Sequence, residues 1–210
     1  MPNSELKDFV NKAPQLIGAL RSRIVSTSPP DMFVHPLGFL YFELFRQQSL
    51  TVRLHIWPGR TLRQTIHVTP IHSHDWKLQS LVLCGTITNT VHCLRGSSID
   101  PTHRVYRVFH NENIDYLVPT SQVGTVVEGS VTRLFQSDAY VVSAGELHST
   151  EVDEATISAT LLLATHSPKL SAPEVLGPLS GRPYTHRRPR CTSDFALTAV
   201  DTVLSSLVNS

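Results

Sequence analysis

The stretch PIHSHDWKLQ at residues 70–79 carries the strongest pattern in the chain, and SAGELH at residues 143–148 answers it. One residue separates His72 from His74, and side chains two apart on a strand point to the same face. Both imidazoles can therefore reach one point. His148, at the end of a Gly-x-x-His turn, would complete a set of three nitrogen ligands. Such a set leaves coordination positions open, as catalytic metal sites do.

These residues resemble the first motif of the cupin superfamily, which reads roughly His-x-His, a few residues, Glu and then Gly. His72, His74 and Gly85 take their places in it, although the last spacing is short by one residue. Gln79 stands where the family usually has glutamate. The segment 71–90 is most similar to the thiol (cysteine) dioxygenase branch, which also lacks the glutamate and binds iron(II) through three histidines.

The second cupin motif, Pro-x-Gly-x-x-His, is matched by Gly145 and His148, with Ser143 in place of the proline. The resemblance covers about residues 35–166. It implies an all-β fold, the cupin double-stranded β-helix or jelly-roll barrel, here with N- and C-terminal helices. It also implies a bound Fe(2+), although nitrogen ligands accept other divalent metals such as nickel, manganese, copper or zinc.

The resemblance further implies roles for Gln79 and for an arginine. Gln79 is expected beside the metal, where its amide would hydrogen-bond a metal-bound water or substrate. Thiol dioxygenases hold the substrate carboxylate with an arginine on an early strand, which suits guanidinium geometry. Arg46 lies in that region, with Arg53 and Arg63 as alternatives, and Arg46 can equally be a surface charge at a hairpin tip.

The branch also has a serine-histidine-tyrosine relay on the strand after its last ligand, where this chain has the apolar run TLLLAT at 160–165. The missing relay indicates a less polar pocket. Tyr140, Tyr106 or Trp76 could supply ring surface or a hydroxyl there, unless they are ordinary core residues.

Three segments are expected along the chain. Residues 1–34 form an N-terminal helical segment, with a helix over 5–26 that Pro14 kinks or splits. Residues 35–166 form the cupin barrel. Residues 167–210 form a polar loop, either a lid or a packed arm, and a helix over 194–207 capped by Ser193. Strands are expected at 39–45, 50–57, 62–68, 72–83, 86–94, 104–109, 115–118, 123–134, 139–142, 147–152 and 157–165.

Composition narrows the class of partner. The 210 residues carry 18 Lys plus Arg and 17 Asp plus Glu, so no basic surface for nucleic acid or an anionic membrane is expected. The first residues lack a signal pattern and no apolar run could span a membrane, which indicates a soluble, cytoplasmic protein. The three cysteines are expected to be reduced thiols. Pairing of barrel edges makes a homodimer plausible.

Other polar clusters receive plainer interpretations. His110-Asn111-Glu112 has the spacing of a two-histidine, one-carboxylate site, but the turn-forming residues around it favour an exposed loop. The basic run 187–190 is interpreted as solvated. His55, His67 and His92 could lie near the metal, whereas His103, His166 and His186 are expected at the surface.

The resulting hypothesis is a metal-dependent oxidoreductase: a non-haem iron(II), dioxygenase-like cupin. Its partners would be dioxygen and a small amino-acid-like or thiol-containing metabolite. Two alternatives stay open. One is a metal-dependent isomerase, lyase or hydrolase that does not use dioxygen, and the other is a non-catalytic ligand-binding cupin.

Overall fold

The computed structural model describes residues 11–26, 32–59, 68–96, 99–153, 155–166 and 172–208. Residues 62–67 of the strand expected at 62–68, and residues 5–10 of the helix expected over 5–26, lie outside these residues. The elements run in the order α2 (Ala13–Ile24), β1 (Leu40–Gln47), β2 (Leu50–Trp57), β3 (Trp76–Cys84), β4 (Ile87–Gly96), β5 (His103–Asn111), β6 (Ile114–Leu134), β7 (Ala139–Val142), β8 (Leu147–Val152), β9 (Ser158–His166), β10 (Glu174–Gly177), β11 (Tyr184–Arg187) and α3 (Ser193–Val208).

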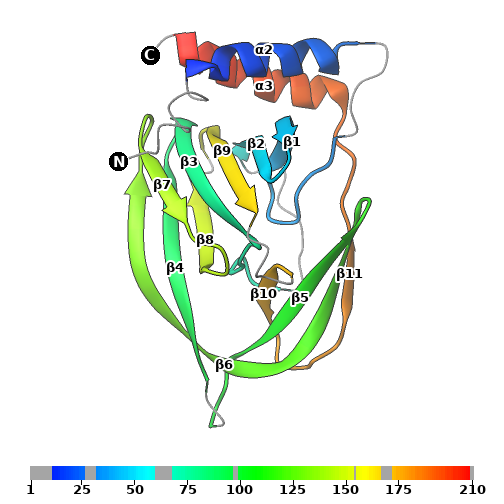
Figure 1. Cartoon of the computed structure of the whole chain (residues 1–210), viewed down its shortest axis with the longest axis vertical. Helices are drawn as coiled ribbons and strands as arrows, with labels where there is room; N and C mark the ends of the chain where they lie inside the picture. Colours follow the sequence, from blue (N-terminus) through cyan, green and yellow to red (C-terminus); the bar gives the residue numbers. More distant parts are fainter. Residues whose placement is uncertain are drawn as a thin grey trace.

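Two antiparallel sheets make up the barrel (Figure 1). One has the order β1-β2-β9-β3-β7, and the other has the order β10-β5-β6-β4-β8. A bridge between His72 and His148 adds the segment before β3 to the second sheet, next to β8. The chain thus alternates between the sheets at β2, His72, β3 and β4, and again at β6, β7, β8 and β9. This is the strand order of a two-sheet jelly roll, which confirms the predicted all-β fold class.

Strand β9 shows why this sequence forms the middle of a sheet. Its residues SATLLLA are buried on both faces, unlike the alternating pattern of a half-exposed strand. Leu161 and Leu163 face outward into a large apolar cluster, while Leu162 and Ala164 face the barrel interior. Both faces of β9 are therefore covered.

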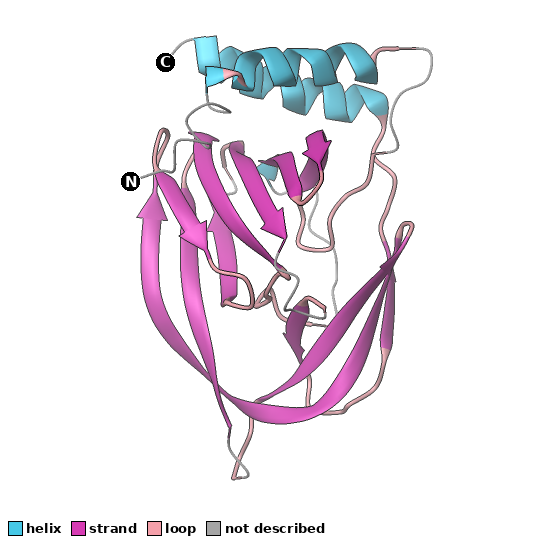
Figure 2. Ribbon diagram, viewed as in Figure 1, coloured by secondary structure: helices cyan, strands magenta, loops and turns pink. Residues whose placement is uncertain are grey.

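Helices α2 and α3 form a separate layer over the outer face of the β1-β2-β9-β3 region (Figures 1 and 2). Ile17 and Leu20 of α2 and Val200 of α3 join Leu161 in one buried cluster. Pro14 is in the first turn of α2, where its missing N–H costs no helical hydrogen bond, and Lys12 forms a turn just before α2, so the helix expected over 5–26 is split there rather than kinked. Thr192, rather than Ser193, caps α3, because its Oγ1 accepts from the Phe195 N–H at 3.4 Å.

The second sheet is extended by the long strand β6 and by β10 and β11 of the C-terminal arm. Residues 115–118 and 123–134, expected as two strands, belong to the single 21-residue strand β6. Pro119 is tolerated within it because the pairing with β5 shifts register there. β10 pairs with β5 and β11 with β6, so the polar stretch before α3 is a packed arm.

The three cysteines are free thiols, as expected. Among the described residues, no helix is both long and apolar enough to cross a membrane.

Candidate metal centre and cavity

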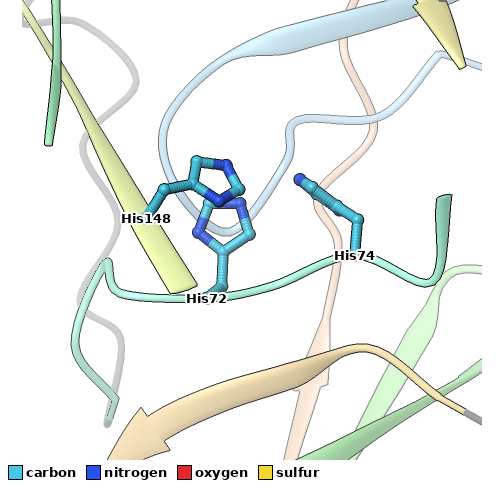
Figure 3. Close-up of side chains that lie close together, drawn as sticks. All are labelled: His72, His74 and His148. Carbon is cyan, nitrogen blue, oxygen red and sulfur yellow. The ribbon is translucent and has the colours of Figure 1, made fainter. Parts of the chain in front are cut away.

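His72, His74 and His148 converge, as the motif predicts (Figure 3). One nitrogen from each ring lies within 4.8 Å of the others. The ring centroids are 4.8 Å apart for His72 and His74, 4.4 Å for His72 and His148, and 5.2 Å for His74 and His148. Within the described residues, this is the group of three such side chains that could hold a metal ion.

Backbone hydrogen bonds, and not the alternation of a regular strand as expected, bring these histidines together. His72 and His74 precede β3 and are not on a regular strand. His72 and His148 exchange two backbone hydrogen bonds, of 3.0 and 2.9 Å. The carbonyl of His74 accepts from the N–H of Gly145, whose φ of 80° is the left-handed conformation that glycine adopts without strain. The Gly-x-x-His turn therefore positions two of the three candidate ligands.

Hydrogen bonds to carbonyl groups fix the protonation of two imidazoles. Nδ1 of His72 lies 2.8 Å from the carbonyl oxygen of Pro70, and Nδ1 of His148 lies 3.1 Å from that of Glu146. A carbonyl only accepts, so each Nδ1 carries the hydrogen and each Nε2 keeps a lone pair. This is the arrangement that orients metal-binding histidines.

Burial also favours the neutral form of all three rings. It lowers the pKa of His148 to about 3 and also lowers the pKa of His72. The pKa of His74 is held well below its usual value by burial first and by the neighbouring His72 and His148 second. Metal binding requires neutral imidazole, so at neutral pH these rings are ready for it.

The residues fit a first-row divalent metal. Metal–nitrogen bonds of about 2.1 Å would bring the ligand atoms to within about 3 to 3.5 Å of one another. A small rotation of His74 would close the difference, since its ring makes no hydrogen bond within the described residues and, apart from the other two histidines, stacks on Trp76 with centroids 5.2 Å apart. No carboxylate belongs to the group, so three neutral ligands would leave the ion its full charge.

A cavity of about 420 Å³ opens beside His72 and His74. Its walls come from both sheets, from the turn before β1 and from the C-terminal arm. Phe39, Trp76 and Leu162 give it ring and aliphatic surface. The volume suits a small organic molecule.

Arg46 and Arg53 both line this cavity but differ in exposure and in their hydrogen-bond partners. Arg46 is half-exposed and its guanidinium is bound by Glu43, with Nε–Oε1 and Nη2–Oε2 distances of 2.8 and 2.5 Å. Arg53 is more buried. Its Nε has no hydrogen-bond partner in the described structure, and burial lowers its pKa. Its guanidinium carbon lies 4.9 Å from the centre of the Trp76 ring. Arg63 lies outside the described residues.

Gln79 does not reach the cavity. Trp76 and Leu78 of β3 line it, and alternation along the strand turns Gln79 to the opposite, outer face. There Gln79 is buried and pairs with Leu163, a member of the cluster beneath the helices. The prediction fails because His72 and His74 precede the strand, so its register does not tie them to Gln79.

The three aromatic residues considered for the pocket differ in position. Trp76 lines the cavity. Tyr140 packs inside the barrel against the cluster of Leu78 and Leu162, away from the cavity wall, and burial raises its pKa. Tyr106 is fully buried under the arm, where its hydroxyl donates to the carbonyl of Pro178 at 2.8 Å.

The basic run at 187–190 is not wholly solvated, because Arg188 is buried in the cavity wall. Its Nε and Nη2 donate to the two carboxylate oxygens of Asp115 at 2.9 and 2.8 Å, and its Nη1 donates to the Tyr41 hydroxyl at 2.7 Å. His110, expected in an exposed loop, is half-exposed and has its Nδ1 2.7 Å from an Asp115 oxygen. These contacts attach the C-terminal arm to β1 and β6, and no local motif signals them.

Four further histidines line the cavity, and of these only His55 was expected near the metal. They are His35, His55, His166 and His186. His166 has its Nδ1 3.6 Å from an Asp75 oxygen, so its expected surface position is only partly right. His92 lies elsewhere, where its Nε2 is 2.9 Å from the Ser149 hydroxyl, and His67 lies outside the described residues. Alternation along β2 places His55 beside Arg53 on the inner face, a signal that the sequence did contain.

No protein-family model matches the chain, and no curated protein matches it. Solved structures with a similar chain course include the Schizosaccharomyces pombe Cnp3 cupin domain (11% identity, TM-score 0.36, covering 64% of this chain and 65% of that one). DMSP lyase DddQ from Ruegeria pomeroyi DSS-3 has 14% identity and a TM-score of 0.34, covering 64% and 50%. Hydroquinone 1,2-dioxygenase PnpCD, in complex with Cd2+ and 4-hydroxybenzonitrile, has 12% identity and a TM-score of 0.38, covering 64% and 67%.

These proteins differ in activity, and identities this low carry no function to the chain. The strand order and the histidine positions are independent of them. The strand order gives this chain a two-sheet jelly-roll barrel, and the three histidines converge where His72 and His74 line the cavity.

Proposed function

We propose that this protein is a non-haem iron(II) oxygenase that oxidises a small organic acid, amino-acid-like or thiol-containing, in the cavity beside His72, His74 and His148. The observation that carries the proposal is the convergence of three neutral imidazoles without a carboxylate, two of which, His72 and His74, line this cavity. In His72 and His148, a hydrogen bond from Nδ1 to a backbone carbonyl orients the ring and leaves the Nε2 lone pair free.

Iron(II) on these three nitrogens would supply open positions for a substrate donor atom and dioxygen and would pass electrons between them. The chain's own residues have other tasks. Trp76 stacks on His74 and limits the directions in which that ring can turn. Phe39 and Leu162 give the substrate an apolar surface and exclude water from it.

Arg53 is proposed to hold the carboxylate of the substrate. The Nε of Arg53 is buried without a hydrogen-bond partner in the described structure, which is costly, and a ligand carboxylate would remove that cost. Glu43 is the cross-strand neighbour of Arg53, but its carboxylate is engaged by Arg46. Arg53 therefore replaces Arg46 as the residue proposed for this role.

A metal-dependent lyase, isomerase or hydrolase is the second candidate. Glu112 and Glu174 line the cavity, and a carboxylate near a metal-bound substrate can act as a general base. Dioxygen distinguishes the two candidates. An oxygenase binds its substrate without dioxygen but does not convert it.

The test is a screen of small thiols, amino acids and related acids with the iron(II)-loaded protein, following oxygen consumption and product together. Turnover that stops in an anaerobic chamber supports the oxygenase. Undiminished anaerobic turnover refutes it and selects the second candidate.

The arginine assignment is tested on the same substrate with Arg53→Met and the control variant Glu43→Gln/Arg46→Met. A hydrogen bond to a charged group contributes about 1.5 to 3 kcal/mol, so Arg53→Met should lower kcat/KM by about 10- to 100-fold. Glu43→Gln/Arg46→Met should change it less than about 3-fold, because it removes an exposed ion pair and leaves no free carboxylate beside Arg53. Equal losses in the two variants would contradict the assignment.

A further inference from the structure

His35, in the turn before β1, is held in the opposite tautomer to the metal-site histidines. Its Nδ1 accepts the backbone N–H of Leu37 at 3.2 Å. An N–H can only donate, so Nδ1 of His35 has no hydrogen, and in the neutral ring Nε2 carries it. His35 also stacks on Phe39, with ring centroids 4.2 Å apart and planes 16° apart. The ring is fixed in place as a hydrogen-bond donor on the cavity wall.

Tyr41 is oriented as a donor by a different contact. Its hydroxyl oxygen accepts from Nη1 of Arg188 at 2.7 Å, and a guanidinium cannot accept in return. The hydroxyl hydrogen must then be directed elsewhere, and no acceptor for it is recorded among the described residues. Tyr41 lines the cavity. Asp115 accepts two hydrogen bonds from Arg188 and so keeps that guanidinium beside Tyr41.

The two donors belong to one wall of the cavity. The rings of His35 and Tyr41 meet edge to face, with centroids 6.1 Å apart. Tyr41 pairs with His55 across the β1–β2 ladder, and Arg53 is two residues from His55 on the same face. Such diagonal neighbours lie about 7 to 8 Å apart, within reach of long side chains. The wall thus presents two neutral donors on one side and the Arg53 cation on the other.

We propose that His35 Nε2–H and Tyr41 O–H form a second anchoring subsite, which binds an oxygen acceptor of the substrate while Arg53 binds its carboxylate. Two hydrogen-bond donors on one wall select a carbonyl or anionic oxygen over an alkyl group. The substrate class is then a small organic acid that carries a second oxygen acceptor, such as an oxo acid. This inference rests on the proposed function in taking the cavity as the substrate site, but it does not depend on the metal or on dioxygen.

The test measures the binding of matched probes by calorimetry to the full-length protein as purified. The probes are 4-oxopentanoate and 5-oxohexanoate, compared with pentanoate and hexanoate, which keep the carboxylate and lack the carbonyl. Two added neutral hydrogen bonds should make one oxo acid bind about tenfold more tightly than its alkanoate. Equal affinities in both pairs overturn the proposal.

Two substitutions at one position separate binding from a structural role. His35→Asn keeps an oxygen near the position of Nδ1, for the Leu37 N–H, and loses the donor at Nε2. His35→Gln places an amide N–H near Nε2 and loses the turn contact. Selectivity for the oxo acid should vanish in His35→Asn and persist in part in His35→Gln. The reverse result would make His35 a turn residue only.

The tyrosine is tested by Tyr41→Phe, with Tyr116→Phe as the matched control, since Tyr116 is exposed on β6. Tyr41→Phe should lose most of the selectivity, and Tyr116→Phe should keep it. Selectivity unchanged in Tyr41→Phe removes Tyr41 from the subsite.

Failure of the metal site is distinguished by repeating the comparison in His148→Ala. Selectivity that persists there belongs to the wall of His35 and Tyr41. Selectivity that disappears there but survives in His35→Asn belongs to the metal and overturns the inference.

Discussion

Replacing Arg188 by methionine should destabilise the protein strongly, because Arg188 and Asp115 form a buried ion pair. Their side chains are 10% and 5% exposed, and Arg188 donates two hydrogen bonds to the carboxylate. Removing one member leaves the other as a buried, unpaired charge, which typically costs about 3 to 5 kcal/mol. In a protein of this size, each kcal/mol lowers Tm by about 2 to 4 °C, so a loss of about 6 to 20 °C is expected.

The double variant Asp115→Leu/Arg188→Met should recover much of this loss. It removes both charges together, and a buried ion pair replaced by apolar residues is often neutral in stability. Urea unfolding at neutral pH gives the free energy of unfolding for each variant. Arg187→Met is the control, since Arg187 is exposed and should change that free energy by less than about 0.5 kcal/mol. A loss below about 1 kcal/mol in Arg188→Met would refute a buried pair that holds the arm on the barrel.

Three further results are expected. Gly145→Ala should lower the free energy of unfolding by about 1 to 2 kcal/mol, because its φ is 80°, and should weaken metal binding. Gly96→Ala, where no atom lies within 4 Å of the added Cβ, should do neither, and equal melting curves for the two variants would contradict the role of the turn. Gln79→Ala should leave metal content and turnover intact while lowering stability by about 1 to 2 kcal/mol, and a loss of metal would place Gln79 at the centre after all. Burial raises the pKa of Asp115, but its contacts with His110 and Arg188 outweigh burial and hold that pKa below its usual value. The ionised carboxylate therefore stabilises the fold at any pH above the usual pKa, and this stabilisation is lost as the pH falls through the lowered pKa of the folded state. Asp115→Asn should therefore lose part of the acid dependence of urea unfolding, and an unchanged pH profile would contradict the pair.

Local patterns predicted the barrel and the metal ligands for different reasons. The ends of β2, β7 and β8 agree with the sequence because alternation and turn residues bound these strands. The three histidines were found through spacing and a Gly-x-x-His turn, although the strand geometry assumed for His72 and His74 was wrong. Their convergence depends on hydrogen bonds to residues 145 and 148, which are long-range.

The rest of the site depends on contacts that no local pattern encodes. Arg188 looks like one member of a basic run, and only the pairing of β11 with β6 brings it to Asp115. Arg46 and Arg53 both lie on early strands, and their roles separate only when Glu43 is seen to engage Arg46. Gln79 was misplaced because a family position was carried over to a strand whose facing the motif does not fix.

The central claim, one metal ion on His72, His74 and His148, is tested most directly by elemental analysis of protein purified without added metal. Wild-type protein and His103→Ala should each carry about one divalent metal per chain. The side chain of His103 is hydrogen-bonded to the Thr102 hydroxyl and does not belong to the three-histidine group. His72→Ala, His74→Ala and His148→Ala should each lose most of it, since a structural or catalytic site rarely holds a metal on two ligands. Full metal occupancy in all three variants would contradict the account.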